Sequence, residues 1–116
     1  MMGQILYNRG LANGSLMRFE QAIADQYSAI EAIGGNNNAY KHRFQLGILL
    51  RRLANHGVSS QREKDDRIEQ SINELRKAVE LCPDEAPAHN NLGLSYFEND
   101  LFIDALGSYT SAIQKE

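Results

Sequence analysis

The C-terminal part of the chain repeats itself at a spacing of 34 residues, and this periodicity constrains the fold more than any other feature of the sequence. Three pairs of small or apolar residues lie at this spacing: Ser71 and Ala105, Leu75 and Tyr109, Ala78 and Ala112. Within each copy these residues recur at helical intervals. A period of about 20 to 50 residues indicates supersecondary units that stack, because one unit alone cannot bury its apolar face. The sequence therefore predicts an all-α protein of repeated helix pairs.

A glycine marks the first helix of each of three copies, at Gly10, Gly47 and Gly93. Gly47 and Gly93 lie 46 residues apart, which places an insertion of 12 residues in the middle copy, near 56–67. Glycine inside a helix costs about 1 kcal/mol relative to alanine. A cost repeated at matched places predicts that the partner helix approaches closely there.

Each copy resembles the tetratricopeptide repeat, whose pattern is W-x2-L-G-x2-Y, then A-x3-F, then P. The last copy carries the pattern best, at His89, Leu92, Gly93, Tyr96, Ala105 and Tyr109. The first two copies are looser, and Gln26 stands where the first should have an aromatic residue. Nearly the whole chain resembles three tetratricopeptide repeats.

The resemblance implies one domain over residues 1–116, a short right-handed α-solenoid of antiparallel helix hairpins. The repeats are expected at 3–36, 40–85 and 86–116. About six helices are expected, at 3–16, 19–33, 38–55, 61–82, 86–98 and 102–115. Ser60 and Glu63 fit a capping box at the start of the fourth helix, with two extra turns free in solvent, and Asp84 is expected to cap the fifth. Tyr96, Phe97, Phe102 and Tyr109 are expected to fill the gaps between layers.

Composition excludes several classes of function. With 116 residues and a net charge of −3, the chain has no global electrostatic reason to bind nucleic acid or an anionic membrane. It has no apolar run long enough for a membrane span and no signal-peptide pattern. Its one cysteine, Cys82, excludes an internal disulfide, so we expect a cytoplasmic, reducing location.

No constellation predicts catalysis. His42, His56 and His89 lie far apart and outside metal-ligand spacings, and His89 takes a core position of the repeat. Cys82 has no identifiable base and is expected to be a buried thiol. We therefore expect no catalytic residue, no metal and no cofactor, and not an enzyme.

In tetratricopeptide proteins the first helices of the pairs line a concave groove, so the resemblance implies that a partner peptide or helix binds there. The groove positions are Tyr7, Asn8, Leu11, Lys41, Phe44, Gln45, Ile48, Arg52, Asn90, Asn91 and Leu94. Asn8, Gln45 and Asn91 form an amide row that could hold a peptide backbone, or could bond water or a neighbouring turn. Lys41, Arg51 and Arg52 would suit an acidic segment, unless they are ordinary solvated charges.

Two further expectations concern partners. The positions that would bind a heat-shock C-terminal carboxylate hold Tyr7, Leu11, Gln45, Pro87 and Asn91. None is cationic, so we expect no such binding.

The last helix also carries an apolar stripe that would face a following helix, at Phe102, Leu106, Tyr109 and Ile113. The alternative function is therefore a scaffold segment of a longer protein, or a homodimer formed through this uncapped face.

Overall fold

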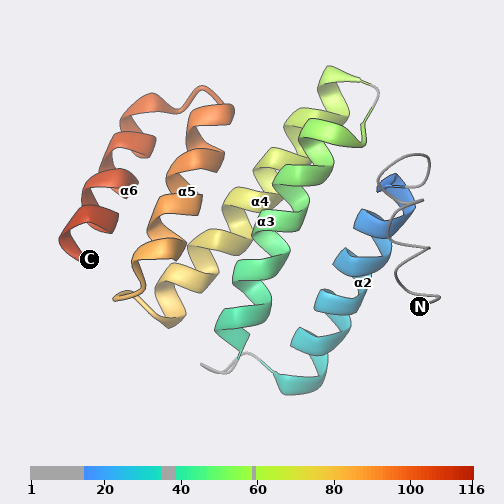
Figure 1. Ribbon diagram of the computed structural model, residues 1–116, viewed down its shortest axis with the longest axis horizontal. Coiled ribbons are helices and arrows are strands. Elements are labelled where there is room, and N and C mark those ends of the chain that lie inside the picture. The colour runs from blue at the N-terminus through green and yellow to red at the C-terminus, as the bar shows by residue number, and fades with distance from the viewer. Residues whose placement is uncertain (1–14, 35–38, 59) are drawn as a thin grey trace.

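The computed structural model describes residues 15–34, 39–58 and 60–116, which contain five α-helices and no strand. The helices are α2 (Ser15–Ile33), α3 (Tyr40–His56), α4 (Gln61–Leu81), α5 (Ala86–Glu98) and α6 (Phe102–Gln114). They run alternately up and down across the molecule, each beside the next (Figure 1). The predicted all-α fold of stacked helix hairpins is confirmed.

The predicted boundary at residue 19 is wrong, because α2 begins at Ser15 and runs through the expected turn without a break. Residues 15–19 contain neither glycine nor proline, so nothing in them interrupts a helix. Most of the helix expected at 3–16 lies outside the described residues, as do Tyr7, Asn8, Gly10 and Leu11.

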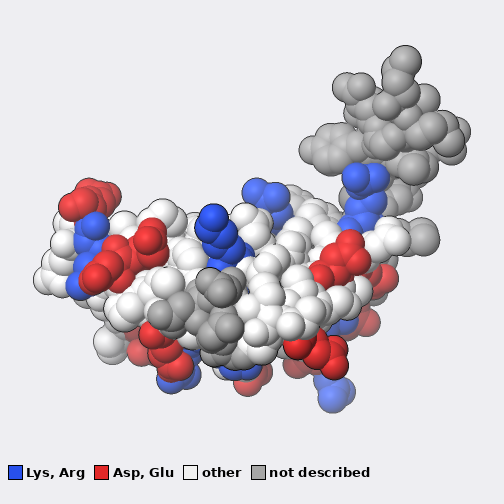
Figure 2. Space-filling model, turned by 90° about the horizontal axis from the view of Figure 1, so that it is seen from below, with Lys and Arg blue, Asp and Glu red and all other residues white. Residues whose placement is uncertain are grey.

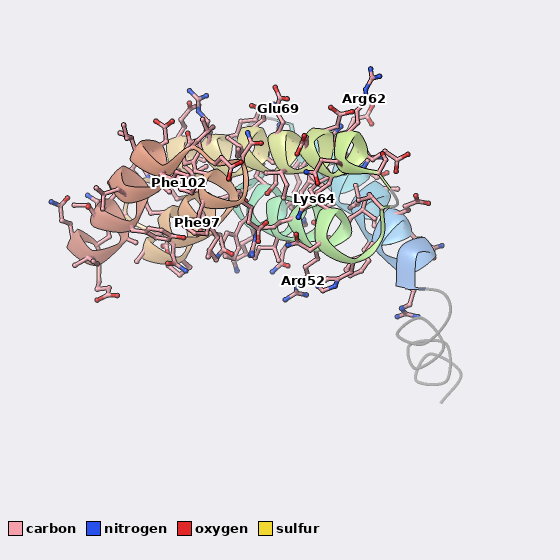
Figure 3. The ribbon with its side chains drawn as sticks, turned by 90° about the horizontal axis from the view of Figure 1, so that it is seen from above. Arg52, Arg62, Lys64, Glu69, Phe97 and Phe102 are labelled. Atoms are coloured by element: carbon pink, nitrogen blue, oxygen red, sulfur yellow. The ribbon has the colours of Figure 1, made fainter. Side chains whose placement is uncertain are left out.

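The helices form two layers, with α3 and α5 in one and α4 and α6 in the other (Figure 3). Two apolar clusters hold the stack together. The first joins α2 to α3 and contains Ile23, Ile30, Leu46, Leu50 and Leu53. The second joins α3, α4 and α5 and contains Ala54, Ile68, Ile72, Leu75 and Leu92, with Phe44, Val79 and Tyr96 packed against it. Each hairpin therefore buries its apolar face against the next, as a solenoid requires.

The two described repeat glycines mark equivalent close contacts. A Cβ on Gly47 would lie 2.7 Å from Cδ2 of Leu75, and one on Gly93 would lie 2.7 Å from Cε1 of Tyr109. The predicted close approach of the partner helix is confirmed at both positions. Leu75 and Tyr109 are 34 residues apart, so the sequence repeat is also a repeat of contacts.

Ser71 stands where the last copy has Ala105, and its hydroxyl joins three helices. Ser71 Oγ donates to the carbonyl oxygen of Gly47 at 2.6 Å and lies 2.8 Å from Ser95 Oγ. Because Ser71 has one hydroxyl hydrogen, Ser95 must be the donor of the second bond. This chain links α5 to α4 and α4 to α3 in the core.

The insertion lengthens the hairpin of α3 and α4. These helices have 17 and 21 residues, whereas α5 and α6 have 13 each. Ser60 Oγ accepts from the amide of Glu63 at 3.2 Å, so the predicted N-cap is confirmed. The first residues of α4 are exposed, but Leu53 and Ile68 are buried and Val58 packs on the first apolar cluster. The two extra turns of α4, residues 61–67, are exposed apart from the half-buried Lys64 and Arg67, so they lie largely in solvent, as predicted.

Three local predictions are wrong. Glu85, not Asp84, is the N-cap residue of α5, and Asp84 instead accepts from Lys115 Nζ at 3.2 Å. Phe97 and Phe102 do not fill a gap between layers: each is 55% exposed, and their rings meet edge-on with centroids 5.3 Å apart. Cys82, expected to be buried, is half-buried where α4 ends.

Candidate partner-binding surface

Side-chain bonds fix α3 beside α5. Arg51 Nη2 donates to Asn91 Oδ1 at 2.8 Å, and Asn55 Nδ2 donates to Glu98 Oε1 at 3.1 Å. Arg51 and Asn55 are one helical turn apart, and Asn91 and Glu98 are two turns apart, so each pair lies on one face of its helix. These faces meet, and the layer of α3 and α5 forms a continuous surface.

The predicted groove residues on α3 form a single stripe. Lys41, Gln45, Ile48 and Arg52 follow one another at intervals of four, three and four residues, which places them on one side of the helix. Lys41, Gln45 and Arg52 are exposed and Ile48 is half-buried. Figure 3 shows Arg52 pointing away from the layer of α4 and α6.

The predicted groove residues on α5 differ in their surroundings. Asn90 is exposed and Leu94 is half-buried. The amide of Asn91 is engaged at both ends, because its oxygen accepts from Arg51 and its nitrogen donates to the carbonyl of Pro87 at 2.9 Å. A bond to a neighbouring turn is the alternative that the sequence left open for the amide row. Asn8, the first member of that row, lies outside the described residues.

Phe44 lies at the edge of the surface and also belongs to the fold. It packs against the apolar cluster of α3, α4 and α5 and stacks on Tyr40, with ring centroids 5.9 Å apart. Burial raises the pKa of Tyr40, and the charges of Glu85 and Cys82 raise it further. The stacked pair therefore presents a neutral aromatic border at the start of α3.

The charged side chains of α3 are all basic. The helix carries Lys41, Arg43, Arg51 and Arg52 and no acidic residue, in a chain whose net charge is −3. Arg43 turns inward and donates from Nη1 to both carboxylate oxygens of Glu74, at 2.7 and 2.8 Å. Lys41 and Arg52 remain exposed. Figure 2, which views the molecule from below, shows basic and acidic groups separated by uncharged surface.

A cavity of about 640 Å³ lies between α5 and α6. Its lining brings together two sets of residues that the sequence treated separately, Asn90 and Asn91 of the groove and Tyr109 and Ile113 of the terminal stripe. Pro87, Ala112 and Glu116 complete one side of it and were not predicted.

The outer side of α6 is apolar and open. Phe102, Leu106 and Ile113 are 55%, 66% and 68% exposed, whereas Tyr109 is half-buried against Gly93. Ile103 is 89% exposed and was missed, although its place in the apolar run of α6 was a signal.

The polar residues that could suggest chemistry have structural partners. A ring nitrogen of His42 lies 2.8 Å from Gln26 Oε1, which accounts for the polar residue in place of an aromatic one. Nε2 of His89 lies 2.7 Å from the carbonyl oxygen of Pro83, so this histidine joins its helix to the preceding turn. Within the described ranges, no group of three or more His, Cys, Asp or Glu side chains could hold a metal ion.

These features define a helical-repeat protein whose hairpins share one set of contacts. The model of the TPR repeat family matches residues 66–100, which run from the second turn of α4 to the turn after α5. This match covers one repeat of the tetratricopeptide repeat family, whose domains in general bind other proteins and are in general not catalytic. No curated protein matches the chain. None of the helices in the described part of the chain is long and apolar enough to cross a membrane.

Proposed function

We propose that the chain is a non-catalytic module that captures a segment of a partner protein on the surface formed by α3 and α5. The observation that carries this proposal is the α3 stripe, where Lys41 and Arg52 are exposed beside the half-buried Ile48 and the helix has no acidic residue. Complementary charge directs the approach of a partner, while apolar groups contribute most of the affinity.

The preferred segment in this proposal is extended and acidic. Ile48 and Leu94 offer apolar contacts, and the exposed Gln45 and Asn90 offer both donors and acceptors to a peptide backbone. Asn91 has a supporting role, because its amide already joins Arg51 to the first turn of α5. The proposal treats the three repeats at 3–36, 40–85 and 86–116 as one domain, and it includes Tyr7, Asn8 and Leu11, which lie outside the described residues, as further contacts.

A selection from a displayed library of random peptides tests the proposal. We expect the selected peptides to be enriched in Asp and Glu and to bind more weakly as salt is added. The double variant Lys41→Glu, Arg52→Glu should weaken their binding at least tenfold. The matched control is Arg62→Glu, Arg76→Glu, which makes the same charge change at exposed positions of α4, and Figure 3 shows Arg62 on the opposite side from Arg52. Equal losses in both double variants, or selected peptides without acidic residues, would contradict the proposal.

A further inference from the structure

The 34-residue period relates an apolar stripe on α4, which is buried, to an apolar stripe on α6, which is largely exposed. A shift of 34 residues carries Ile68, Ile72, Leu75 and Val79 of α4 onto Phe102, Leu106, Tyr109 and Ile113 of α6. On α4 the first three are 1%, 5% and 0% exposed, whereas Phe102 and Leu106 of α6 are 55% and 66% exposed. The same stripe is thus buried in one hairpin and open in the next.

Within its own hairpin the stripe on α4 packs on α3, where Leu75 lies against Gly47, and from the next hairpin it is covered by α5. Leu92 and Tyr96 of α5 lie in the same apolar cluster as Ile68, Ile72 and Leu75 of α4. The small residues Ala88 and Ser95 are fully buried on α5 and allow the helices to approach closely. An established interface of this chain therefore shows what kind of helix fits such a stripe.

The cavity between α5 and α6 lies where the period would place such a helix. Its residues Asn90, Tyr109 and Ile113 are the repeat equivalents of Phe44, Leu75 and Val79. Those three residues contact the cluster that contains Leu92 of α5. The hollow and the exposed stripe thus form one continuous site, bounded by two helices as the seat of α5 is.

We propose that this site, on the outer side of α6 and in the cavity beside α5, docks an amphipathic α-helix of a partner protein. The helix would present a leucine and an aromatic residue four positions apart among small residues, as α5 does. A second copy of α6 fits less well, because Phe102, Ile103, Leu106 and Ile113 would set large side chains against large ones on both sides. This site is distinct from the α3 stripe of the proposed function.

A chain extension tests the chemistry of the site. A copy of residues 83–99 is appended directly after Glu116, where the 34-residue register places its proline. We expect amide hydrogen exchange in α6 to slow at least tenfold and the Tm to rise by at least about 4 °C. The matched control replaces the copied Leu92 and Tyr96 by Asp, and it should have neither effect. Unchanged exchange in α6 with the intact extension would overturn the proposal.

Binding in trans is tested with a labelled peptide of residues 84–99, held helical by a cross-link between positions 90 and 94. We expect it to bind the full chain, to bind Leu106→Lys at least tenfold more weakly, and to be blocked by the intact extension. The control is Gln114→Lys, which places the same charge elsewhere on the exposed side of α6 and should bind normally. Circular dichroism establishes that both variants are folded.

Two results would overturn the proposed occupant. One is peptide binding that Leu106→Lys leaves unchanged. The other is a wild-type dimer in light scattering that Leu106→Lys dissociates, because the site would then hold a second copy. The Lys41→Glu, Arg52→Glu variant should bind the helical peptide as the wild type does, so this proposal and the proposed function can fail separately.

Discussion

The hydroxyl oxygens of Ser71 and Ser95 lie 2.8 Å apart in the core, where neither residue has exposed surface. The pair belongs to a directed chain in which Ser95 donates to Ser71 and Ser71 donates to the carbonyl of Gly47. Ala105 occupies the equivalent position in the last copy and is 2% exposed, so the fold accepts a methyl group there. The hydroxyl chain is therefore particular to the contact of α3, α4 and α5.

Removing the Ser71 hydroxyl alone should lower the free energy of unfolding by more than half of the loss caused by removing both the Ser71 and the Ser95 hydroxyls. Ser71→Ala leaves the Ser95 hydroxyl buried without its acceptor, and we expect a loss of about 1–3 kcal/mol in the free energy of unfolding. Ser71→Ala with Ser95→Ala removes both polar groups, so the two effects should fall short of additivity by at least about 0.5 kcal/mol. Urea denaturation of the four proteins in a double-mutant cycle measures this. Strict additivity would show that the two hydroxyls do not interact.

A methyl group on Gly93 should destabilise the protein, although alanine is the better helix former. The added Cβ would lie 2.7 Å from Cε1 of Tyr109, and overpacking of a core typically costs about 1–3 kcal/mol. Gly107→Ala is the matched control, since a Cβ there would meet no atom within 4 Å. We expect it to stabilise α6 by about 0.5–1 kcal/mol. Thermal or urea unfolding gives both values, and opposite signs are the expected outcome.

The ion pair of Arg43 and Glu74 should matter mainly through the charge left behind when one partner is removed. The side chain of Glu74 is 5% exposed and that of Arg43 is 18% exposed. Arg43→Met should cost about 3 kcal/mol, because the carboxylate stays buried and keeps only Lys77, at 3.5 Å. Arg43→Met with Glu74→Leu should lie within about 1 kcal/mol of the wild type. If the double variant is as unstable as the single one, the ion pair itself is the stabilising element.

Stability should fall as the pH rises past about 10. Burial raises the pKa of Tyr40 and Tyr96 above their ordinary value of 10.0. The unfolded chain therefore loses these phenolic protons first, and each proton lost favours unfolding until the folded state also ionises. Below that pH both states are neutral, so these tyrosines cause no change. Unfolding free energies between pH 8 and 11 should decline less steeply for Tyr40→Phe, Tyr96→Phe than for the wild type, and parallel curves would contradict this.

Two features of the fold could be predicted from the sequence: the close helix contacts at the repeat glycines, and the greater length of the middle hairpin. Glycine at the matched positions Gly47 and Gly93 costs helix stability. Close approach of the partner helix is the physical reason to expect glycine there. The 46-residue separation of these glycines likewise indicated the longer hairpin. Both inferences concern the backbone, which the repeat pattern constrains directly.

The side-chain bonds between hairpins could not be predicted in the same way. Arg51 and Asn91 are 40 residues apart, and their bond depends on how far α5 stands from α3. In the sequence Ser71 is only a small residue in a position that accepts alanine. Its partner Ser95 becomes evident only when α4 and α5 are packed together. The start of α2 was mistaken because the repeat pattern was looser in the first copy than in the others.

The longer hairpin of α3 and α4 has a consequence for engineering. Its extra turns extend the tip near Ser60, while Gly47 and Leu75 keep the contact that Gly93 and Tyr109 make in the shorter hairpin. Length added at the tip therefore leaves the spacing of the stack unchanged. A foreign loop or epitope grafted between Gly57 and Ser60 should extend beyond the end of the hairpin without altering either of the two proposed binding surfaces.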